Sequence, residues 1–168
     1  MYFVRDFIGR DLCFHKCECC DIGEHRILPP GDRIFENQDL VIYTNISVPM
    51  LGFIVVAPKK HVSRFSELEM IVQISLLTIS SEIVEKMKEL GVADEFTVLK
   101  MEGDGIDHCK IWILPKLDGI FENGFDFSLL ENRYSMERRK IPVSEPYDIL
   151  FLNTRLKEHF KKRKFLME

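Results

Sequence analysis

One long helical pattern, set among short strand-like segments, constrains the fold more than any other feature of this sequence. It starts at Ser66-Glu-Leu-Glu69, a pattern typical of a capping box, and Gly91 is a natural C-terminal stop. The apolar residues that recur between them at helical spacing are Leu68, Ile71, Val72, Leu76, Ile79, Ile83, Met87 and Leu90. We therefore predict one long helix that buries this stripe against a sheet.

Strand-like segments lie on both sides of this helix. The five segments that predict strands are residues 33–37, 40–44, 52–57, 96–101 and 108–114. The first two are close enough for a hairpin, and Pro58 and Pro115 end two of the others because proline has no N–H to donate. Residues 147–165 predict a last helix. Because strands and helices hardly alternate, we expect an α+β domain with an antiparallel sheet.

The length of 168 residues fits one compact domain that needs no disulfides. We expect an irregular N-terminal arm over residues 1–31, a core over residues 32–116, and a C-terminal extension over residues 117–168 that packs on the same domain. No apolar run reaches the roughly 20 residues that span a bilayer, and Asp6 and Arg10 interrupt the apolar start of the chain. These features predict a soluble, cytoplasmic protein.

The net charge of −4 is spread unevenly, since the stretch from Arg155 to Lys164 alone carries +5. A chain this acidic elsewhere is a poor general nucleic-acid binder, because phosphate contacts need clustered basic residues. The basic stretch is either a solvated helix face or a contact for an acidic partner. One side of the last helix carries Ile149, Leu152, Leu156, Phe160 and Lys164. That side packs either on its own domain, on a second copy of the chain, or on a partner.

Four of the five cysteines crowd into eight residues near the start of the chain, and only Cys109 lies elsewhere. An odd number of cysteines, with two of them adjacent, favours a metal site or free thiols over disulfides. The residues that could supply a metal site within this arm alone are Cys13, His15, Cys17, Cys19, Cys20 and His25.

The order of motifs resembles the histidine triad (HIT) superfamily. The matching pieces are Cys17-Glu-Cys-Cys20, the strand from Gly52 to Pro-Lys-Lys-His61, the helix start Ser66-Glu-Leu, and His108-Cys-Lys-Ile-Trp-Ile-Leu-Pro115. The resemblance covers residues 17–116. It implies a half-barrel of about five antiparallel strands with one long helix, usually as a homodimer.

In that family the middle histidine of the triad attacks the α-phosphate of a nucleotide. Here Lys110 stands at that position and Trp112 at the third. An unperturbed lysine is ammonium at pH 7 and attacks only if burial lowers its pKa by several units. The resemblance thus implies a HIT-like nucleotide-binding or interaction module that has lost nucleotidyl transfer. The alternative is an active hydrolase or transferase of phosphoanhydrides or phosphoramidates, working through Lys110 or through a metal held by Glu102, Asp104 and Asp107.

The positions that would bind a nucleotide depart from the family as well. Many members carry Gly-Gln-Ser-Val-x-His, whose Gln and Ser bind phosphate, where this chain has Gly103-Asp-Gly-Ile-Asp-His108. An Asp that usually holds the ribose hydroxyls corresponds to Asn45, and Trp112 is either a wall of the pocket or a core residue. The resemblance therefore implies a nucleotide site at Asn45, Asp104, Gly105 and Trp112.

The metal pattern of the family is complete. In zinc-bearing members the Cys-x-x-Cys pair, the histidine of Pro-x-x-His and the first triad histidine bind one zinc. Cys17, Cys20, His61 and His108 occupy those positions. Two thiolates and two imidazoles make a closed tetrahedral site, which is typical of structural rather than catalytic zinc. Cys109 alternates with these strand residues and is expected to face the opposite side of the sheet.

Overall fold

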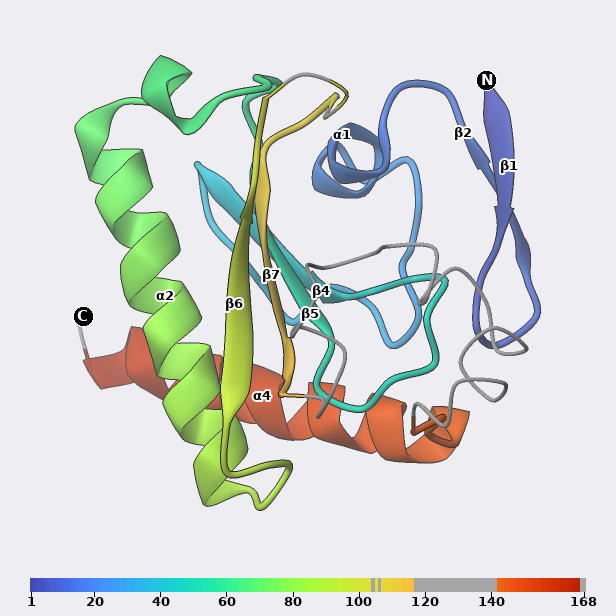
Figure 1. Cartoon of the computed structure of the whole chain (residues 1–168), viewed down its shortest axis with the longest axis vertical. Coiled ribbons are helices and arrows are strands. Elements are labelled where there is room, and N and C mark those ends of the chain that lie inside the picture. Colours follow the sequence, from blue (N-terminus) through green and yellow to red (C-terminus); the bar gives the residue numbers. More distant parts are fainter. Residues whose placement is uncertain (104, 106, 117–141, 167–168) are drawn as a thin grey trace.

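The structure is a computed structural model that describes residues 1–103, 105, 107–116 and 142–166, with side chains of the last helix described up to residue 162. Its centre is a five-stranded antiparallel sheet in the order β3-β4-β5-β7-β6 (Figure 1). The strands are β3 (Phe35–Glu36), β4 (Leu40–Thr44), β5 (Ile54–Pro58), β6 (Phe96–Met101) and β7 (Lys110–Pro115). The predicted antiparallel α+β architecture is confirmed.

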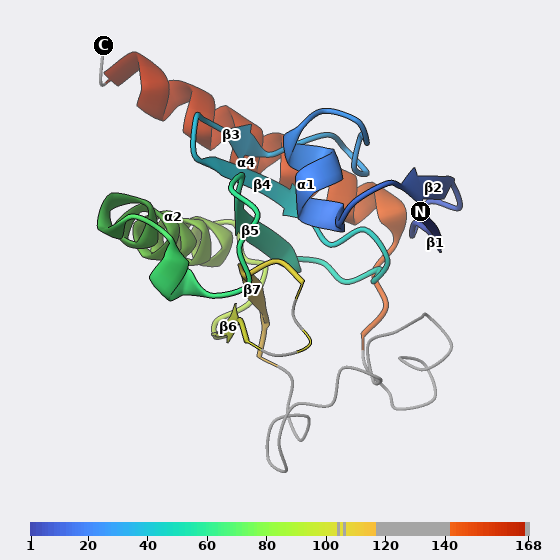
Figure 2. The same ribbon diagram turned by 90° about the horizontal axis from the view of Figure 1, so that it is seen from above.

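Alternating side chains give the sheet two buried faces. On one face, Ile54 and Val56 of β5 pack with the long helix α2 (Met70–Glu89) and with the last helix α4 (Pro146–Leu166). On the other face, Val55 and Ala57 pack beneath the short helix α1 (Glu18–Gly23). Figure 2 shows α2 and α1 on opposite sides of the sheet. Because both faces are covered, β4 and β5 are buried along their whole length.

The last helix joins the main core. Its buried apolar residues are Ile149, Leu152, Leu156 and Phe160. The rings of Phe160 and Phe35 lie 4.9 Å apart, which ties the helix to the edge strand β3. Of the alternatives for this apolar side, the structure therefore favours packing on the chain's own domain; the side chain of Lys164 lies outside the described residues.

The expectation of an irregular N-terminal arm is wrong. The arm forms a hairpin of β1 (Tyr2–Arg5) and β2 (Asp11–Phe14), followed by α1. Four-residue strands are too short to show a clear alternation, and the cysteines in α1 obscure its helical pattern. Burial against the sheet stabilises the arm instead: Phe14 and Ile22 are both fully buried.

The start of α2 also differs from the prediction. Ser66 lies in a short 3-10 helix (Phe65–Glu67), and the cap forms one turn early: the Glu67 carboxylate accepts the N–H of Arg64 at 2.9 Å. The predicted end is confirmed, because Gly91 has a φ of 71° and its N–H bonds to the carbonyl of Lys88 at 2.9 Å. Within the described part of the chain, none of the helices is both long and apolar enough to cross a bilayer.

Candidate metal centre

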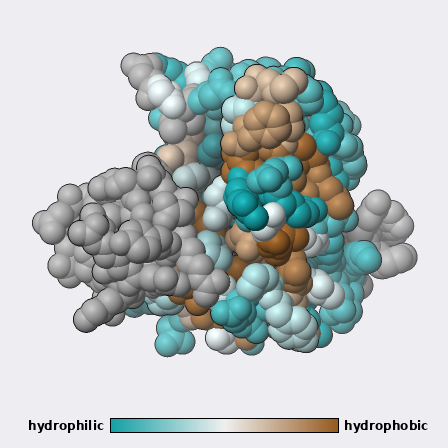
Figure 3. Space-filling model, turned by 90° about the vertical axis from the view of Figure 1, so that its right-hand side faces the viewer, coloured by the Kyte–Doolittle hydropathy of each residue, from teal (hydrophilic) through white to brown (hydrophobic). Residues whose placement is uncertain are grey.

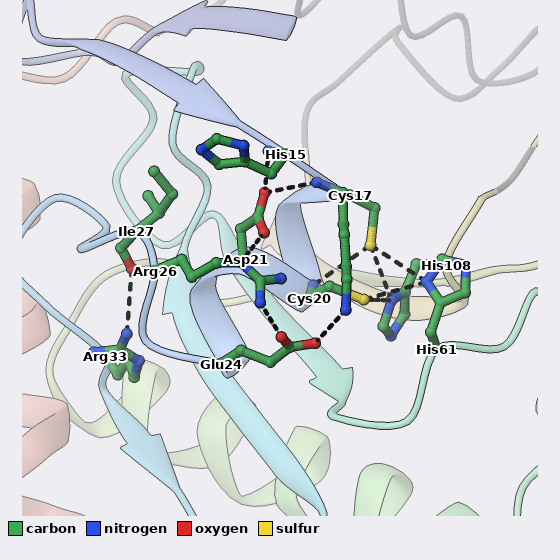
Figure 4. A network of polar contacts seen from close by, with 11 residues as sticks. His15, Cys17, Cys20, Asp21, Glu24, Arg26, Ile27, Arg33, His61 and His108 are labelled. Atoms are coloured by element: carbon green, nitrogen blue, oxygen red, sulfur yellow. Dashed lines mark hydrogen bonds and ion pairs between the residues drawn. The ribbon is translucent and has the colours of Figure 1, made fainter. Parts of the chain in front are cut away.

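Three segments that are far apart in the sequence bring together four side chains that could hold a metal ion (Figure 4). Cys17 caps the N-terminus of α1 and Cys20 lies in its first turn. His61 follows β5, and His108 precedes β7. One ligand atom from each of these residues lies within 4.8 Å of all the others. The structure thus brings together all four residues that the resemblance implied.

The distances fit a tetrahedral zinc ion. The Cys17 Sγ lies 3.5 Å from His61 Nδ1 and 3.2 Å from His108 Nδ1, and the Cys20 Sγ lies 3.2 Å and 3.5 Å from the same two atoms. Zinc bonds of typical length to sulfur and nitrogen, at tetrahedral angles, place the two ligand atoms about 3.5 Å apart. Both imidazoles face the sulfurs with the same ring nitrogen, so the donor set suits zinc.

The ring of His108 is held in the orientation that ligation requires. Its Nε2 donates to the carbonyl oxygen of Pro58 at 2.9 Å, which leaves Nδ1 unprotonated and directed at the sulfurs. Burial lowers the pKa of His108 to about 4. The neutral, ligating form of this imidazole is therefore the one present at pH 7.

His61 lies at the exposed side of the cluster, where half of its side chain reaches solvent. Its Nε2 is 3.7 Å from a carboxylate oxygen of Asp107. A cavity of about 520 Å³ opens beside it, lined by Lys16, Cys17, Cys20, Glu24, Lys59, His61 and Asp107. Three of the four ligands are buried and the fourth faces this cavity.

The described residues give no support to a metal site formed by the N-terminal arm alone. Among them, the one group of side chains that could hold a metal ion is Cys17, Cys20, His61 and His108. The Cys19 Sγ instead lies 3.3 Å from the hydroxyl of Tyr43, and His25 contacts a carboxylate oxygen of Glu36 at 3.0 Å. The alternative metal site at Glu102, Asp104 and Asp107 gains no support either. A carboxylate oxygen of Glu102 instead accepts the N–H of Phe65 at 2.8 Å. Asp104 lies outside the described residues.

Lys110 and Trp112 share the face of the sheet that carries α1. The Lys110 Nζ lies 6.0 Å from the centre of the Trp112 ring. Burial is the largest single effect and lowers the pKa of Lys110, but Cys19, Glu18, Cys17 and Asp107 together raise it more, so its pKa lies above the usual value. The opposite orientation predicted for Cys109 is confirmed, because its thiol is buried in the core on the α2 side.

A family model named HIT domain matches residues 29–106. An uncharacterized HIT-like protein of Methanocaldococcus jannaschii is 25% identical over 107 residues, which are 61% of this chain and 81% of that protein. Residues 29–106 of the chain are therefore similar to the HIT domain of the histidine triad superfamily. The resemblance inferred from the motifs is thereby confirmed.

Solved HIT structures share the fold. The Zn-bound histidine triad family protein from Mycobacterium smegmatis superposes with a TM-score of 0.61 at 17% identity, over 89% of this chain and 96% of that one. A hypothetical histidine triad nucleotide-binding protein from Sulfolobus tokodaii gives a TM-score of 0.59 at 19% identity, over 88% and 94%. At these identities the likeness shows the HIT fold alone.

The positions expected from the HIT resemblance to bind a nucleotide are only partly brought together. Asn45 directly follows β4 and is buried, and its side-chain oxygen accepts the N–H groups of Ser47 and Val48, both at 3.0 Å. Trp112 packs edge-on against Phe53, with ring centres 5.0 Å apart. Gly105 is exposed in the turn before β7. The amide nitrogen of Asn45 can donate to a ligand hydroxyl, whereas its oxygen is engaged within its own turn.

Two features of the site were missed from the sequence. One is the carbonyl of Pro58, which orients His108. The other is the buried carboxylate of Asp21, which binds the backbone just before Cys17. A backbone acceptor leaves no trace in a residue pattern, and an acidic residue in a first helical turn is common on exposed surfaces. Only the burial of Asp21 sets it apart.

Proposed function

We propose that this HIT-like protein is a zinc-containing nucleotide-binding or interaction module that has lost nucleotidyl transfer. The observation that carries the proposal is Lys110, which stands at the middle triad position, two residues after His108. A histidine nucleophile needs a neutral nitrogen at pH 7, and a lysine there is ammonium. Lys110 therefore supplies a fixed positive charge where the family has an attacking atom.

Zinc is the metal that the four ligands support best. A zinc ion held by Cys17, Cys20, His61 and His108 has its tetrahedral positions filled, so its contribution is to cross-link the chain. The cross-link joins the N-terminal arm to the residues that follow β5 and precede β7. We infer a structural ion that holds α1 against the sheet.

The positive charge of Lys110 also supports binding of an anionic nucleotide that the protein does not cleave. A half-buried ammonium beside the Trp112 ring suits the phosphate of a nucleotide, and the ring offers a surface for stacking. The acidic residues around Gly103 oppose a polyphosphate, since carboxylates repel it. A nucleoside monophosphate is thus the nucleotide that we expect this site to accept.

The decisive experiment compares turnover with binding. The purified zinc-loaded chain is incubated with adenosine 5′-phosphoramidate and with diadenosine polyphosphates, and products are separated by chromatography. We expect no product above a protein-free control. Turnover that Lys110→Ala abolishes, or a nucleotidyl adduct trapped on Lys110, would establish the alternative of an active transferase. Binding of AMP is followed separately by the fluorescence of Trp112, which is the only tryptophan.

Exposed apolar surface supports an interaction role. The face shown in Figure 3 carries the N-terminal hairpin, and brown, apolar side chains gather on it. The hairpin and its ends expose Met1, Tyr2, Phe3 and Ile8. Apolar patches of this kind mark contact sites in many proteins.

We also propose that the chain is a homodimer in the cytoplasm. The first half of α2 exposes a stripe of Met70, Ile71, Ile74 and Leu77, each more than half exposed, so Ile71 does not belong to the buried stripe predicted for this helix. Such a stripe is costly in water and suits an antiparallel contact with the same helix of a second copy. The described cysteines are all free thiols, which supports a reducing compartment.

A further inference from the structure

The loop that presents Cys17 is organised around one buried carboxylate. Asp21 lies in α1 with its side chain fully buried. Its Oδ2 accepts the N–H of His15 at 2.7 Å and the N–H of Lys16 at 3.0 Å. Its Oδ1 accepts the Nε–H of Arg26 at 2.5 Å. Both oxygens are thus engaged, one by the loop and one by a guanidinium (Figure 4).

The bonded loop is the segment that sets the position of a ligand. His15 and Lys16 link the end of β2 to Cys17, whose Sγ faces both imidazoles. Two backbone N–H groups held by one oxygen leave this segment little freedom. A shift of the loop moves the Cys17 sulfur directly, because Lys16, whose N–H is one of the two bonded amides, immediately precedes Cys17.

Arg26 pairs its positive charge with the carboxylates of Asp21 and Glu24. It bonds both to Asp21 and, with a short contact, to Glu24, which also accepts from the Nζ of Lys16 at 3.2 Å. The chain of alternating charges runs from the buried Asp21 outward around α1. Removing one member of a buried ion pair leaves the other uncompensated, so each partner depends on the other.

We propose that Asp21 is a positioning residue of the zinc centre: it sets zinc affinity through the backbone that carries Cys17, without being a ligand. This inference rests on the proposed metal centre. An Asp21→Asn substitution keeps the size and shape of the side chain but cannot accept all three hydrogen bonds that the Asp21 carboxylate accepts. One oxygen becomes an NH2 group, which faces either the Arg26 N–H or the loop N–H groups, donor against donor.

The chain contains a matched control. Asp6 is also fully buried in its side chain, its Oδ1 accepts the N–H groups of Ile8 and Arg10 at 3.1 and 2.8 Å, and its Oδ2 accepts the Arg10 Nε–H at 2.6 Å. The chemistry is the same as at Asp21, but the loop that it holds is the β1–β2 turn. Asp6→Asn therefore reports the general cost of breaking such a loop.

The test measures zinc affinity by competition with a chromophoric chelator, and stability by urea unfolding of the zinc-loaded proteins. We expect Asp21→Asn to bind zinc about 10- to 100-fold more weakly and Asp6→Asn to stay within about twofold of the wild type. Cobalt substitution adds a second measurement, because its visible spectrum reports the thiolate ligands. We expect that spectrum to change in Asp21→Asn only.

Each outcome decides a separate question. Wild-type zinc affinity and an unchanged cobalt spectrum in Asp21→Asn would show that Asp21 serves stability alone. A wild-type chain that binds no stoichiometric zinc would overturn the metal centre itself. Should Asp21→Asn fail to fold, Arg26→Gln removes the same support from a residue that is one-third exposed. We then expect a loss of severalfold in zinc affinity, and no loss would overturn the proposal.

Discussion

The Nε2 of His108 donates a hydrogen bond of 2.9 Å to the carbonyl oxygen of Pro58, the residue that ends the neighbouring strand β5. This bond and the burial of the ring fix the position of His108 in the candidate metal site. His61, by contrast, has half of its side chain in solvent and only a distant carboxylate at 3.7 Å. The two histidines of the site are therefore not equivalent.

This difference predicts unequal costs when each histidine is removed. In the presence of a chelator, His108→Ala is expected to lower the free energy of unfolding by about 2 kcal/mol or more, because it leaves a cavity and an unpaired carbonyl. His61→Ala, at an exposed position, is expected to change it by less than about 1 kcal/mol. Urea unfolding measures both. Equal losses without metal would contradict the assignment of His108 as the buried anchor.

Zinc binding is predicted to depend on pH through the thiols. Burial, with the adjacent Cys17, raises the pKa of Cys20 to about 12, so zinc must displace a proton from this thiol at pH 7. Affinity therefore falls as the pH is lowered, by about tenfold per unit for each proton released. Calorimetry in two buffers with different ionisation enthalpies counts these protons. Cys19→Ala is the control, because burial also raises the pKa of Cys19 to about 12 but its sulfur is not a ligand.

The last helix is predicted to be part of the folded domain. Phe160→Ala is expected to lower the free energy of unfolding by about 3–5 kcal/mol, since the ring is buried against Phe35. Phe151→Ala on the same helix is the control: its ring is 57% exposed, and a change within about 0.5 kcal/mol is expected. If urea unfolding finds equal losses for the two variants, the helix does not pack as the structure shows.

The proposed dimer is predicted to depend on α2. A charge at Ile74, which is 51% exposed, is expected to prevent burial of the apolar stripe, so Ile74→Glu should be monomeric where the wild type is dimeric. Ser81→Glu, at an exposed position of the same helix, is expected to leave the dimer intact. Sedimentation equilibrium measures the mass of each. A wild-type monomer, or an Ile74→Glu dimer, would contradict this contact surface.

Much of the fold was predictable because local patterns agree with the final packing. The apolar stripe of α2 and the αL turn at Gly91 need only neighbouring residues to be recognised. The N-terminal arm was not predictable in this way. Its short strands and α1 acquire their burial from the sheet, so the sequence pattern of the arm contains little of the information that stabilises it.

In the candidate site, too, some features were predictable from the sequence and others depend on the tertiary structure. Through motifs that resemble the HIT family, the sequence predicted the four candidate metal ligands and placed a lysine at position 110, since these are properties of identity and spacing. Tertiary structure decided what supports them: the Pro58 carbonyl that orients His108, and the Asp21 carboxylate that holds the loop before Cys17. Hydrogen bonds to backbone groups depend on where the chain passes in space, and no residue pattern records that path.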